Sequence, residues 1–267
     1  MKQLFRPADI DDLQQFLQQL AGDEQLIWVG LGSNLLVRDG GFDGSVILTK
    51  GRLQQLEISD DMLSAQAGVS CAKAARESAK QGYCGLEFFA GIPGAIGGAL
   101  AMNAGAFGGE TWENVIKVET IDRHGVIRSR LPEDFEVRYR EVKAPVDEYF
   151  VRGWFRLQRG DVNKAQQQIR QLLERRAQTQ PTSQASCGST FRNPQGDFAA
   201  RLIESAGLKG YCIGGACVSE KHANFIINRG SATATDIEQL MGYVQQQVLK
   251  QSSTSLQAEV HIVGEAA

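Results

Sequence analysis

A glycine-rich stretch between residues 85 and 111 constrains this chain more than any other feature. It reads GLEFFAGIPGAIGGALAMNAGAFGGET and holds eight glycines, and most of the residues between them are small or apolar. Glycine loses more conformational freedom on folding than other residues, so this density is costly unless positive φ values or a close approach require it. A backbone without side chains can also direct N–H groups at a phosphate. The stretch therefore indicates either a set of tight turns or a close contact between backbone and ligand.

A second loop of this kind follows a strand predicted at residues 26–29. Residues 28–39 read WVGLGSNLLVRD, so a GLGSN loop separates two apolar runs. Two such loops favour one extended, nucleotide-like ligand. Neither fits a short motif, because GxxxxGK[ST] is absent and Leu35 stands where the dinucleotide fingerprint needs a third glycine to open a helix.

The bulk composition narrows the class of protein. The chain has 267 residues, 42% of them hydrophobic, with a formal charge of -3 and a pI near 5.7, so no nucleic-acid partner is expected. The five cysteines are odd in number and lack CxxC, and the three histidines are scattered, so neither a disulfide framework nor a metal site is expected. We find no signal-peptide pattern and no apolar run of about 18 residues, and we expect no membrane and a cytoplasmic location.

Hydrophobic periodicity predicts helices and strands along the whole chain, with antiparallel sheet in its middle. The predicted helices cover residues 8–20, 71–81, 163–177, 197–206 and 234–250. The predicted strands cover residues 26–29, 45–48, 53–58, 62–67, 115–121, 126–131, 149–157, 224–228 and 260–263. Ser70 is expected to cap the second helix, and Thr235 with Glu238 forms a capping-box pattern at the last one. The polar stretch 178–186 predicts a linker and a domain boundary.

Four blocks of the sequence carry a resemblance to a known family. They are GLGSNLLVRDGGFDGSVI at residues 30–47, GIPGAIGGALAMNAGAFGGE at 91–110, CGSTFRNP at 187–194 and GGACVSEKHANFIIN at 214–228. Together, and in this order, they closely resemble the UDP-N-acetylenolpyruvoylglucosamine reductases. Within that family the chain is more similar to the shorter branch, which lacks a tyrosine-bearing loop. The resemblance implies an α+β fold, with an FAD-binding part of the p-cresol methylhydroxylase/vanillyl-alcohol oxidase type in two subdomains and a C-terminal α+β substrate-binding domain.

The resemblance also implies a domain division. We expect residues 1–57 and 58–180 to form the two FAD-binding subdomains and residues 181–255 the substrate-binding domain. The C-terminal strand, residues 256–267, is a candidate to return to the second subdomain. Family members carry an additional segment ahead of the helix that here starts at Ala8; this chain shows no such segment, so some flavin contacts at that edge are expected to be missing.

In this family NADPH first reduces a non-covalently bound FAD. The reduced flavin then gives a hydride to the methylene carbon of UDP-N-acetylglucosamine enolpyruvate, which makes UDP-N-acetylmuramate for peptidoglycan synthesis, and so serves cell wall biogenesis, cell shape and cell division. We therefore expect NADPH and this substrate as partners, and a monomer. The resemblance implies cofactor contacts from Gly30, Leu31, Gly32, Ser33, Asn34, Leu35, Gly91, Ile92, Pro93, Gly94, Ala95, Gly97, Gly98, Asn103, Ala104 and Gly105.

Three residues are candidates for catalysis. Taken alone, Ser189 beside a glycine is typical of a turn, and no G-x-S-x-G or histidine pattern activates it. Glu259 at the start of a terminal strand is typical of a solvated residue, and Arg140 could simply face solvent. The resemblance implies that Ser189 donates the proton, that Glu259 stabilises the enolic intermediate, and that Arg140 grips the substrate carboxylate.

Other polar residues are expected near the substrate. The resemblance implies substrate contacts from Tyr139, Arg192, Asn193, Lys221 and His222, although a structural role in their loop remains equally open for the last two. The family usually has a serine two residues after the arginine, where this chain has Val142. Cys187 is a competing nucleophile without a partner histidine in view, and we interpret it as a small loop residue.

Two other functions stay open at this point. One is a flavin oxidase of the same superfamily that acts on a hydroxy acid or an alcohol. The other is a nucleotide-sugar binding protein without redox activity. Bound flavin would distinguish the binding protein, which needs none, from the reductase and the oxidase.

Overall fold

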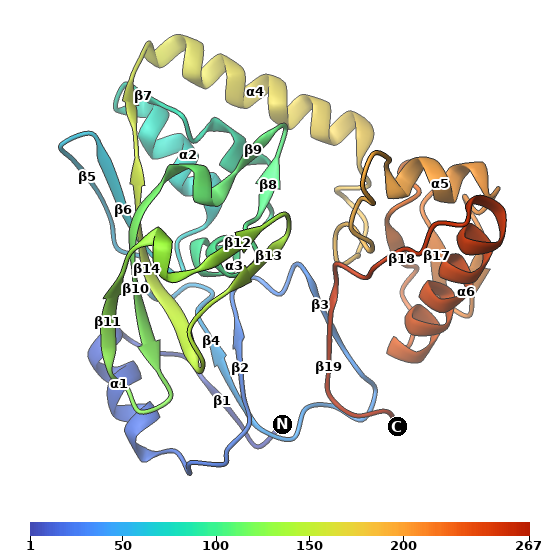
Figure 1. Cartoon of the computed structure of the whole chain (residues 1–267), viewed down its shortest axis with the longest axis horizontal. Coiled ribbons are helices and arrows are strands. Elements are labelled where there is room, and N and C mark those ends of the chain that lie inside the picture. Colours follow the sequence, from blue (N-terminus) through green and yellow to red (C-terminus); the bar gives the residue numbers. More distant parts are fainter. The chain divides into compact units, whose positions relative to one another are not determined.

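The computed structural model describes all 267 residues, which divide into two compact units (Figure 1). Unit 1 comprises residues 1–31 and 44–174, and unit 2 comprises residues 32–43 and 175–267. The short segment 32–43 therefore leaves the first unit, although the chain on both sides of it belongs there. No helix combines the length and the apolar character needed to cross a bilayer.

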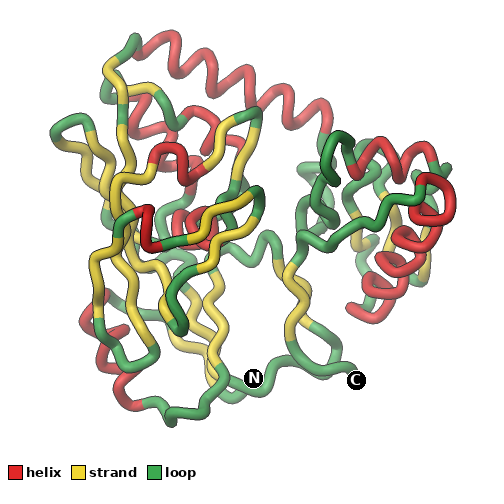
Figure 2. Tube along the Cα trace, viewed as in Figure 1, coloured by secondary structure: helices red, strands yellow, loops and turns green.

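Unit 1 is built from short helices and mostly antiparallel strands (Figure 2). Its helices are α1 (Ile10–Gln19), α2 (Cys71–Lys80), α3 (Ile96–Ala101), the 3₁₀ turns η1 (Glu87–Gly91), η2 (Thr111–Asn114) and η3 (Pro132–Asp134), and most of α4 (Val162–Thr179). Its strands are β1 (Gln3–Phe5), β2 (Leu26–Val29), β4 (Ser45–Leu48), β5 (Leu56–Ser59), β6 (Met62–Gln66), β7 (Tyr83–Cys84), β8 (Gly105–Ala106), β9 (Gly109–Glu110), β10 (Val115–Asp122), β11 (Ile127–Arg130), β12 (Glu136–Arg138), β13 (Glu141–Lys143), β14 (Glu148–Arg156) and β15 (Gln158–Arg159).

Two sheets organise unit 1. A parallel sheet has the order β1-β4-β2, and a five-stranded antiparallel sheet has the order β11-β10-β14-β6-β5. Helix α1 presents Leu13 and Leu17, both at most 1% exposed, to Ile47 of the first sheet and to Val151 of the second. Because the apolar residues of α1 recur at helical spacing, one face of the helix packs against both sheets.

The larger core of unit 1 lies between the five-stranded sheet and the helices α2 and α3. Its largest fully buried side chains include Phe89 and Phe155, whose ring centroids are 5.5 Å apart in an edge-on arrangement. The small residues of α2 allow close packing, and Ser70 accepts a hydrogen bond from the Lys73 N–H at its start, as predicted. This packing holds the glycine-rich stretch against the sheet.

Unit 2 contains β3 (Leu35–Val37), α5 (Ala199–Ser205), β16 (Cys212–Ile213), β17 (Ala216–Val218), β18 (Ile226–Asn228), α6 (Ala234–Ser252) and β19 (His261–Val263). The strands β16, β17 and β18 form an antiparallel sheet, and the core packs α5 and α6 beside it. The C-terminal strand β19 pairs in parallel with β3, which explains why residues 32–43 belong to this unit.

Every helix and strand predicted from periodicity is confirmed, with ends shifted by at most three residues. Two local expectations were wrong. The capping box of α6 is made by Thr233 and Asp236, two residues before the predicted pair, because Thr233 rather than Thr235 accepts the Asp236 N–H. A disulfide joins Cys212 to Cys217, since the turn between β16 and β17 places these residues directly opposite each other.

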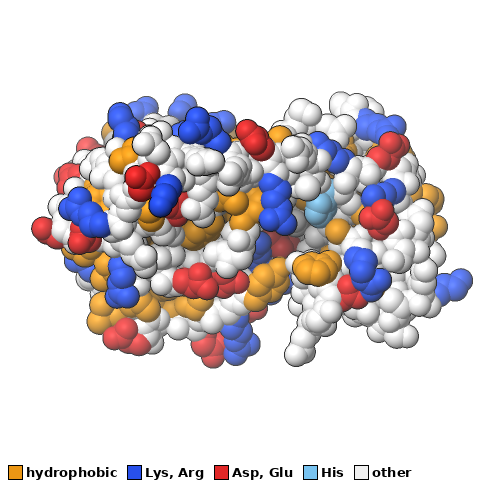
Figure 3. All heavy atoms as spheres, turned by 90° about the horizontal axis from the view of Figure 1, so that it is seen from above, with side chains coloured by type: hydrophobic (Ala, Val, Ile, Leu, Met, Phe, Trp, Pro, Cys, Tyr) orange, Lys and Arg blue, Asp and Glu red, His pale blue; other side chains and the backbone are white.

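Charged side chains of both signs are interspersed over the face shown in Figure 3.

One carboxylate of unit 1 is buried instead of lying on the surface. Glu148 at the start of β14 has a side chain only 5% exposed, and it accepts hydrogen bonds from Arg130 Nε (3.1 Å) and from the Thr120 hydroxyl (2.6 Å). The Arg130 hydrogen bond is the main reason that the pKa of Glu148 lies below its ordinary value of 4.5.

We expect Glu148→Gln to lower the free energy of unfolding by about 1–3 kcal/mol near neutral pH, because it removes charge-assisted hydrogen bonds. A lowered pKa contributes stability above the ordinary value of 4.5, and this contribution is lost as the pH falls through the lowered value. Denaturant unfolding of both proteins over a pH series should therefore show a difference that shrinks in acid. Glu57→Gln, at an exposed position on β5, is the matched control. A difference that does not change with pH would contradict this assignment.

Candidate active site

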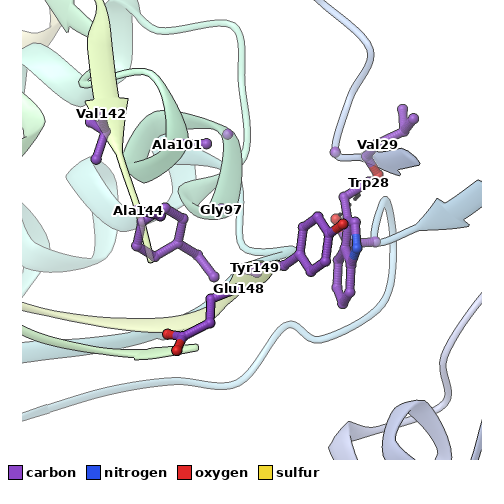
Figure 4. Close-up of a pocket in the computed structure, with 13 residues that line it drawn as sticks. Trp28, Val29, Gly97, Ala101, Val142, Ala144, Glu148 and Tyr149 are labelled. Carbon is purple, nitrogen blue, oxygen red and sulfur yellow. Dashed lines mark hydrogen bonds between the residues drawn. The ribbon is translucent and has the colours of Figure 1, made fainter. Parts of the chain in front are cut away.

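A pocket in unit 1 lies where β2, α3 and β14 meet (Figure 4). It includes Gly30 from the first glycine loop and Gly97 and Gly98 from the glycine-rich stretch, so the structure brings these two parts of the sequence together. The remaining lining residues are Trp28, Val29, Thr49, Ala67, Ala101, Val142, Ala144, Glu148, Tyr149 and Phe150.

The glycines of this pocket differ in what they allow. A Cβ on Gly30 would lie 3.2 Å from the Ala95 Cβ, and a Cβ on Gly97 would lie 2.9 Å from the Ala67 Cβ. Both glycines therefore permit close packing of one backbone segment on another. A Cβ on Gly98 would meet no heavy atom within 4 Å, so this residue leaves open space beside the pocket.

Two backbone N–H groups of the glycine-rich stretch are already hydrogen-bonded within the protein. The N–H of Ile96 donates to the Val69 carbonyl at 2.8 Å, and the N–H of Gly97 donates to the Ala67 carbonyl at 2.9 Å. These two donors stabilise the fold and are not available to a ligand. The glycine-rich stretch thus contributes shape to the pocket more clearly than it contributes donors.

Two aromatic residues of the pocket were missed by the sequence reasoning. The rings of Trp28 and Tyr149 stack with centroids 4.8 Å apart, and Figure 4 shows them side by side. Burial raises the pKa of Tyr149 above its ordinary value. The alternation of β2 could have indicated Trp28, because side chains two residues apart in a strand share a face and Gly30 follows it at that spacing.

A second cluster of unit 1 surrounds Arg140. The residue lies in the turn between β12 and β13 with a positive φ of 56°, and its Nη2 donates to the Gly105 carbonyl at 2.8 Å. The side chain of Asn103 donates to the Arg138 carbonyl at 3.2 Å. The guanidinium carbon also lies 5.4 Å from the centre of the Tyr139 ring. The glycine-rich stretch therefore positions the arginine that the resemblance singled out.

Unit 2 brings Ser189 and Glu259 into neighbouring segments. The Glu259 N–H donates to the Thr190 carbonyl at 2.8 Å, and the Arg192 N–H donates to the Gln257 carbonyl at 2.9 Å. These bonds lie on either side of a bridge between Phe191 and Ala258. The residue after Ser189 is thus bonded directly to the backbone of Glu259.

The second half of the first glycine loop, with Ser33 and Asn34, contacts the segments of Ser189 and Glu259. The Asn34 side chain donates to the Glu259 carbonyl at 3.1 Å, and the His261 N–H donates to the Asn34 carbonyl at 3.0 Å. A Cβ on Gly188 would lie 3.5 Å from the Ser33 carbonyl oxygen. Four of the predicted residues, Ser33, Asn34, Ser189 and Glu259, therefore belong to one small region of unit 2.

The other predicted substrate residues have identifiable structural contacts. Asn193 accepts a hydrogen bond from the Ala199 N–H at the start of α5, at 3.1 Å, and Lys221 Nζ donates to the Ala177 carbonyl. His222 packs edge-on against Phe225, its Nδ1 is buried without a hydrogen-bond partner, and burial lowers its pKa. Burial also raises the pKa of the Cys187 thiol, which disfavours the thiolate that a nucleophile needs.

Most of the remaining cofactor candidates lie in the glycine-rich stretch, and four of them are buried. Gly91, Ile92, Ala95 and Ala104 are buried, and a Cβ on Gly91 would overlap the Phe107 ring. Gly94 accepts a hydrogen bond from the Cys71 N–H at 3.0 Å. Pro93 is exposed, and Leu31 is 41% exposed at the end of the first loop segment of unit 1.

Comparison with known proteins identifies the class. Residues 1–129 match the model of an FAD binding domain, and this part contains the glycine-rich stretch and eight of the thirteen residues that line the pocket. With its α+β fold and this pocket, the chain is a flavoprotein of the FAD-dependent oxidoreductases. Residues 180–263 match the C-terminal domain of UDP-N-acetylenolpyruvoylglucosamine reductase.

The relatives agree with this match. The reductase of Alkalilimnicola ehrlichii is 56% identical over 265 residues, covering 99% of this chain and 89% of the relative. That of Legionella pneumophila strain Corby is 58% identical over 265 residues, covering 98% and 86%. The crystal structure of the reductase from Thermus caldophilus matches with a TM-score of 0.84 at 30% identity, covering 98% of this chain and 92% of that one. The chain belongs to the UDP-N-acetylenolpyruvoylglucosamine reductase family.

The expected family, fold class, enzyme class and FAD cofactor are thereby confirmed. The match of the C-terminal domain does not favour the flavin oxidase or the binding protein without redox activity.

We expect Gly98→Leu to weaken FAD binding by about tenfold or more, because the new side chain would grow into the open space of the pocket. The fold should remain, since glycine is a poor helix residue and its replacement costs no backbone strain here. Gly242→Leu in α6 is the matched control, because its Cβ would also meet nothing within 4 Å. Flavin titration followed by visible absorbance measures the effect. Equal FAD affinity of Gly98→Leu and the control would contradict the placement of the cofactor.

Proposed function

We propose that FAD binds along the surface formed by Gly30 and residues 91–98, and that Ser189, Glu259 and Arg140 carry out the chemistry on the substrate. The reaction is the NADPH-dependent reduction of UDP-N-acetylglucosamine enolpyruvate to UDP-N-acetylmuramate, a step of peptidoglycan precursor synthesis. When bound, FAD takes a hydride from NADPH and delivers it to the methylene carbon of the enolpyruvyl group.

The residues of unit 1 fit this cofactor. The pocket combines three glycines with aromatic and small apolar side chains, which suits a flat, extended ligand in contact with backbone. The indole N–H of Trp28 is buried there without a hydrogen-bond partner, a state that native proteins rarely tolerate in the absence of water or a ligand. Gly32, Ser33, Asn34 and Leu35 continue the first loop and are retained as cofactor contacts.

The observation that carries the proposal is the hydrogen bond between Glu259 N–H and the Thr190 carbonyl, which makes the segments of Ser189 and Glu259 direct neighbours. Hydride addition leaves an electron pair on the carbon beside the carboxylate. Ser189 supplies the proton that completes the new C–H bond, and Glu259 stabilises the enolic form before this transfer.

Arg140 has the chemistry to meet the developing charge. Electron density pushed toward the substrate carboxylate is stabilised by a guanidinium, which can bind both oxygens at once. Its position in a tight turn, tied to Gly105 and flanked by Tyr139, reduces the freedom of the side chain before binding. We assign Tyr139, Arg192, Asn193, Lys221 and His222 to the binding of the substrate.

We further propose the division of the chain into FAD-binding subdomains at residues 1–57 and 58–180 and a substrate-binding domain at 181–255. Residues 256–267 were expected as a candidate to return to the second subdomain. Their strand pairs instead with Leu35–Val37, which lie within residues 1–57, and this pairing supports assigning them to the neighbourhood of the first glycine loop. A monomer in the cytoplasm is the proposed state of the enzyme.

The decisive experiment separates the two half-reactions. The purified, FAD-loaded protein is reduced with NADPH without oxygen, and UDP-N-acetylglucosamine enolpyruvate is then added. Return of the oxidised flavin spectrum is the expected result. A flavin that NADPH reduces but the substrate does not reoxidise would overturn the proposed reaction.

We expect Ser189→Ala to slow the substrate-dependent reoxidation by about 10²–10⁴-fold, the range typical of removing a positioned proton donor. Flavin reduction by NADPH should be unchanged, since the serine has no part in that step. Cys187→Ala tests the competing nucleophile and should leave both steps intact. A large loss for Cys187→Ala together with full activity of Ser189→Ala would reverse these assignments. Stopped-flow absorbance of the flavin measures each step.

A further inference from the structure

The segment that carries Ser189 has little regular structure of its own. Residues 187–193 contain only an isolated bridge, from Phe191 to Ala258, and no helix or strand. On that side the segment is held by its bonds to residues 257–259. A proton donor must stay within hydrogen-bond reach of the carbon it protonates, so the opposite side of the segment also needs a support.

A single side chain provides this support. Asn224 Oδ1 accepts from the Phe191 N–H at 3.0 Å, and Asn224 Nδ2 donates to the Phe191 carbonyl at 2.8 Å. The backbone carbonyl of Asn224 also accepts from the Thr190 N–H at 2.8 Å. The side-chain amide thus takes the place that a neighbouring strand would have, and pairs with both peptide groups of Phe191.

Because the Asn224–Phe191 contact is buried, loss of its hydrogen bonds would be costly. Asn224 is 4% exposed and Phe191 is 1% exposed, so water does not replace a lost bond at low cost. If the amide were removed, the N–H and the carbonyl of Phe191 would both lose their partner. The segment could satisfy them only by shifting, and Ser189 lies two residues away.

We propose that Asn224 is a positioning residue for the proton transfer, which fixes Ser189 by holding Thr190 and Phe191 against the segment 257–259 that bears Glu259. This inference rests on the proposed role of Ser189. It assigns to Asn224 no contact with the substrate or the cofactor. The amide therefore acts on the second half-reaction alone.

The test is Asn224→Ala, with both half-reactions measured in the FAD-loaded enzyme. We expect the reoxidation by UDP-N-acetylglucosamine enolpyruvate to slow by about 10²-fold at saturating substrate, since a displacement of about 1 Å can have this effect. Flavin reduction by NADPH should keep its rate. Asn224→Asp has the same shape and keeps the acceptor for the Phe191 N–H, and its protonated carboxyl can also donate to the Phe191 carbonyl. Because burial favours the protonated form, it should show a smaller loss, of about tenfold, at the acidic end of the pH range.

Asn228→Ala is the matched control. This asparagine ends β18, and its side chain accepts from the N–H groups of Gly230 (2.7 Å) and Ala232 (3.2 Å), away from Phe191. Asn228→Ala should lower the melting temperature, but it should not slow reoxidation more than it slows flavin reduction. The proposal is overturned if the two Asn224 variants slow both half-reactions equally, reoxidise at the original rate, or match Asn228→Ala. Failure of the unsubstituted enzyme to reoxidise would instead overturn the proposed reaction.

Discussion

Close packing of one backbone segment on another is the constraint on which the cofactor pocket depends. Gly30 lies against Ala95, and Gly97 lies against Ala67, with room in each case for no more than a hydrogen atom or a strained methyl group. Such contacts leave no room for a side chain between the start of α3 and the segments that follow β2 and β6. Because these glycines are used for packing, Gly98 is the one whose missing side chain leaves space for a ligand.

Unit 2 depends on a different interaction, the parallel pairing of β3 with β19. Its register joins Leu35 to His261 and Val37 to Val263, residues separated by most of the chain. The pairing carries the loop with Ser33 and Asn34 to the residues just before β19, among them Glu259. Parallel pairing cannot be made by a tight turn, so this arrangement forms only when the two ends of the unit meet.

Local structure was largely predictable from the sequence, and long-range placement was not. Alternation and helical spacing identified each predicted helix and strand because both reflect burial of one face. The cap of α6 was misplaced since Thr233 and Thr235 fit the same pattern, and only the backbone decides between them. The Cys212–Cys217 pair and the stacking of Trp28 on Tyr149 depend on register and strand pairing, which a single sequence does not specify.

The candidate catalytic residues show how a local pattern can mislead. Ser189 beside a glycine is typical of a turn, and Glu259 before a short strand is typical of a solvated residue. Both descriptions are correct locally. The Glu259 N–H nevertheless donates to the Thr190 carbonyl, and the Asn34 side chain donates to the Glu259 carbonyl, so these bonds place both residues in one region. Unit 1 fixes its site by packing, which tolerates no added volume, whereas unit 2 fixes its site by directed bonds to backbone. Substitutions that add volume should therefore affect the cofactor most, and those that remove polar partners should affect the chemistry of the substrate.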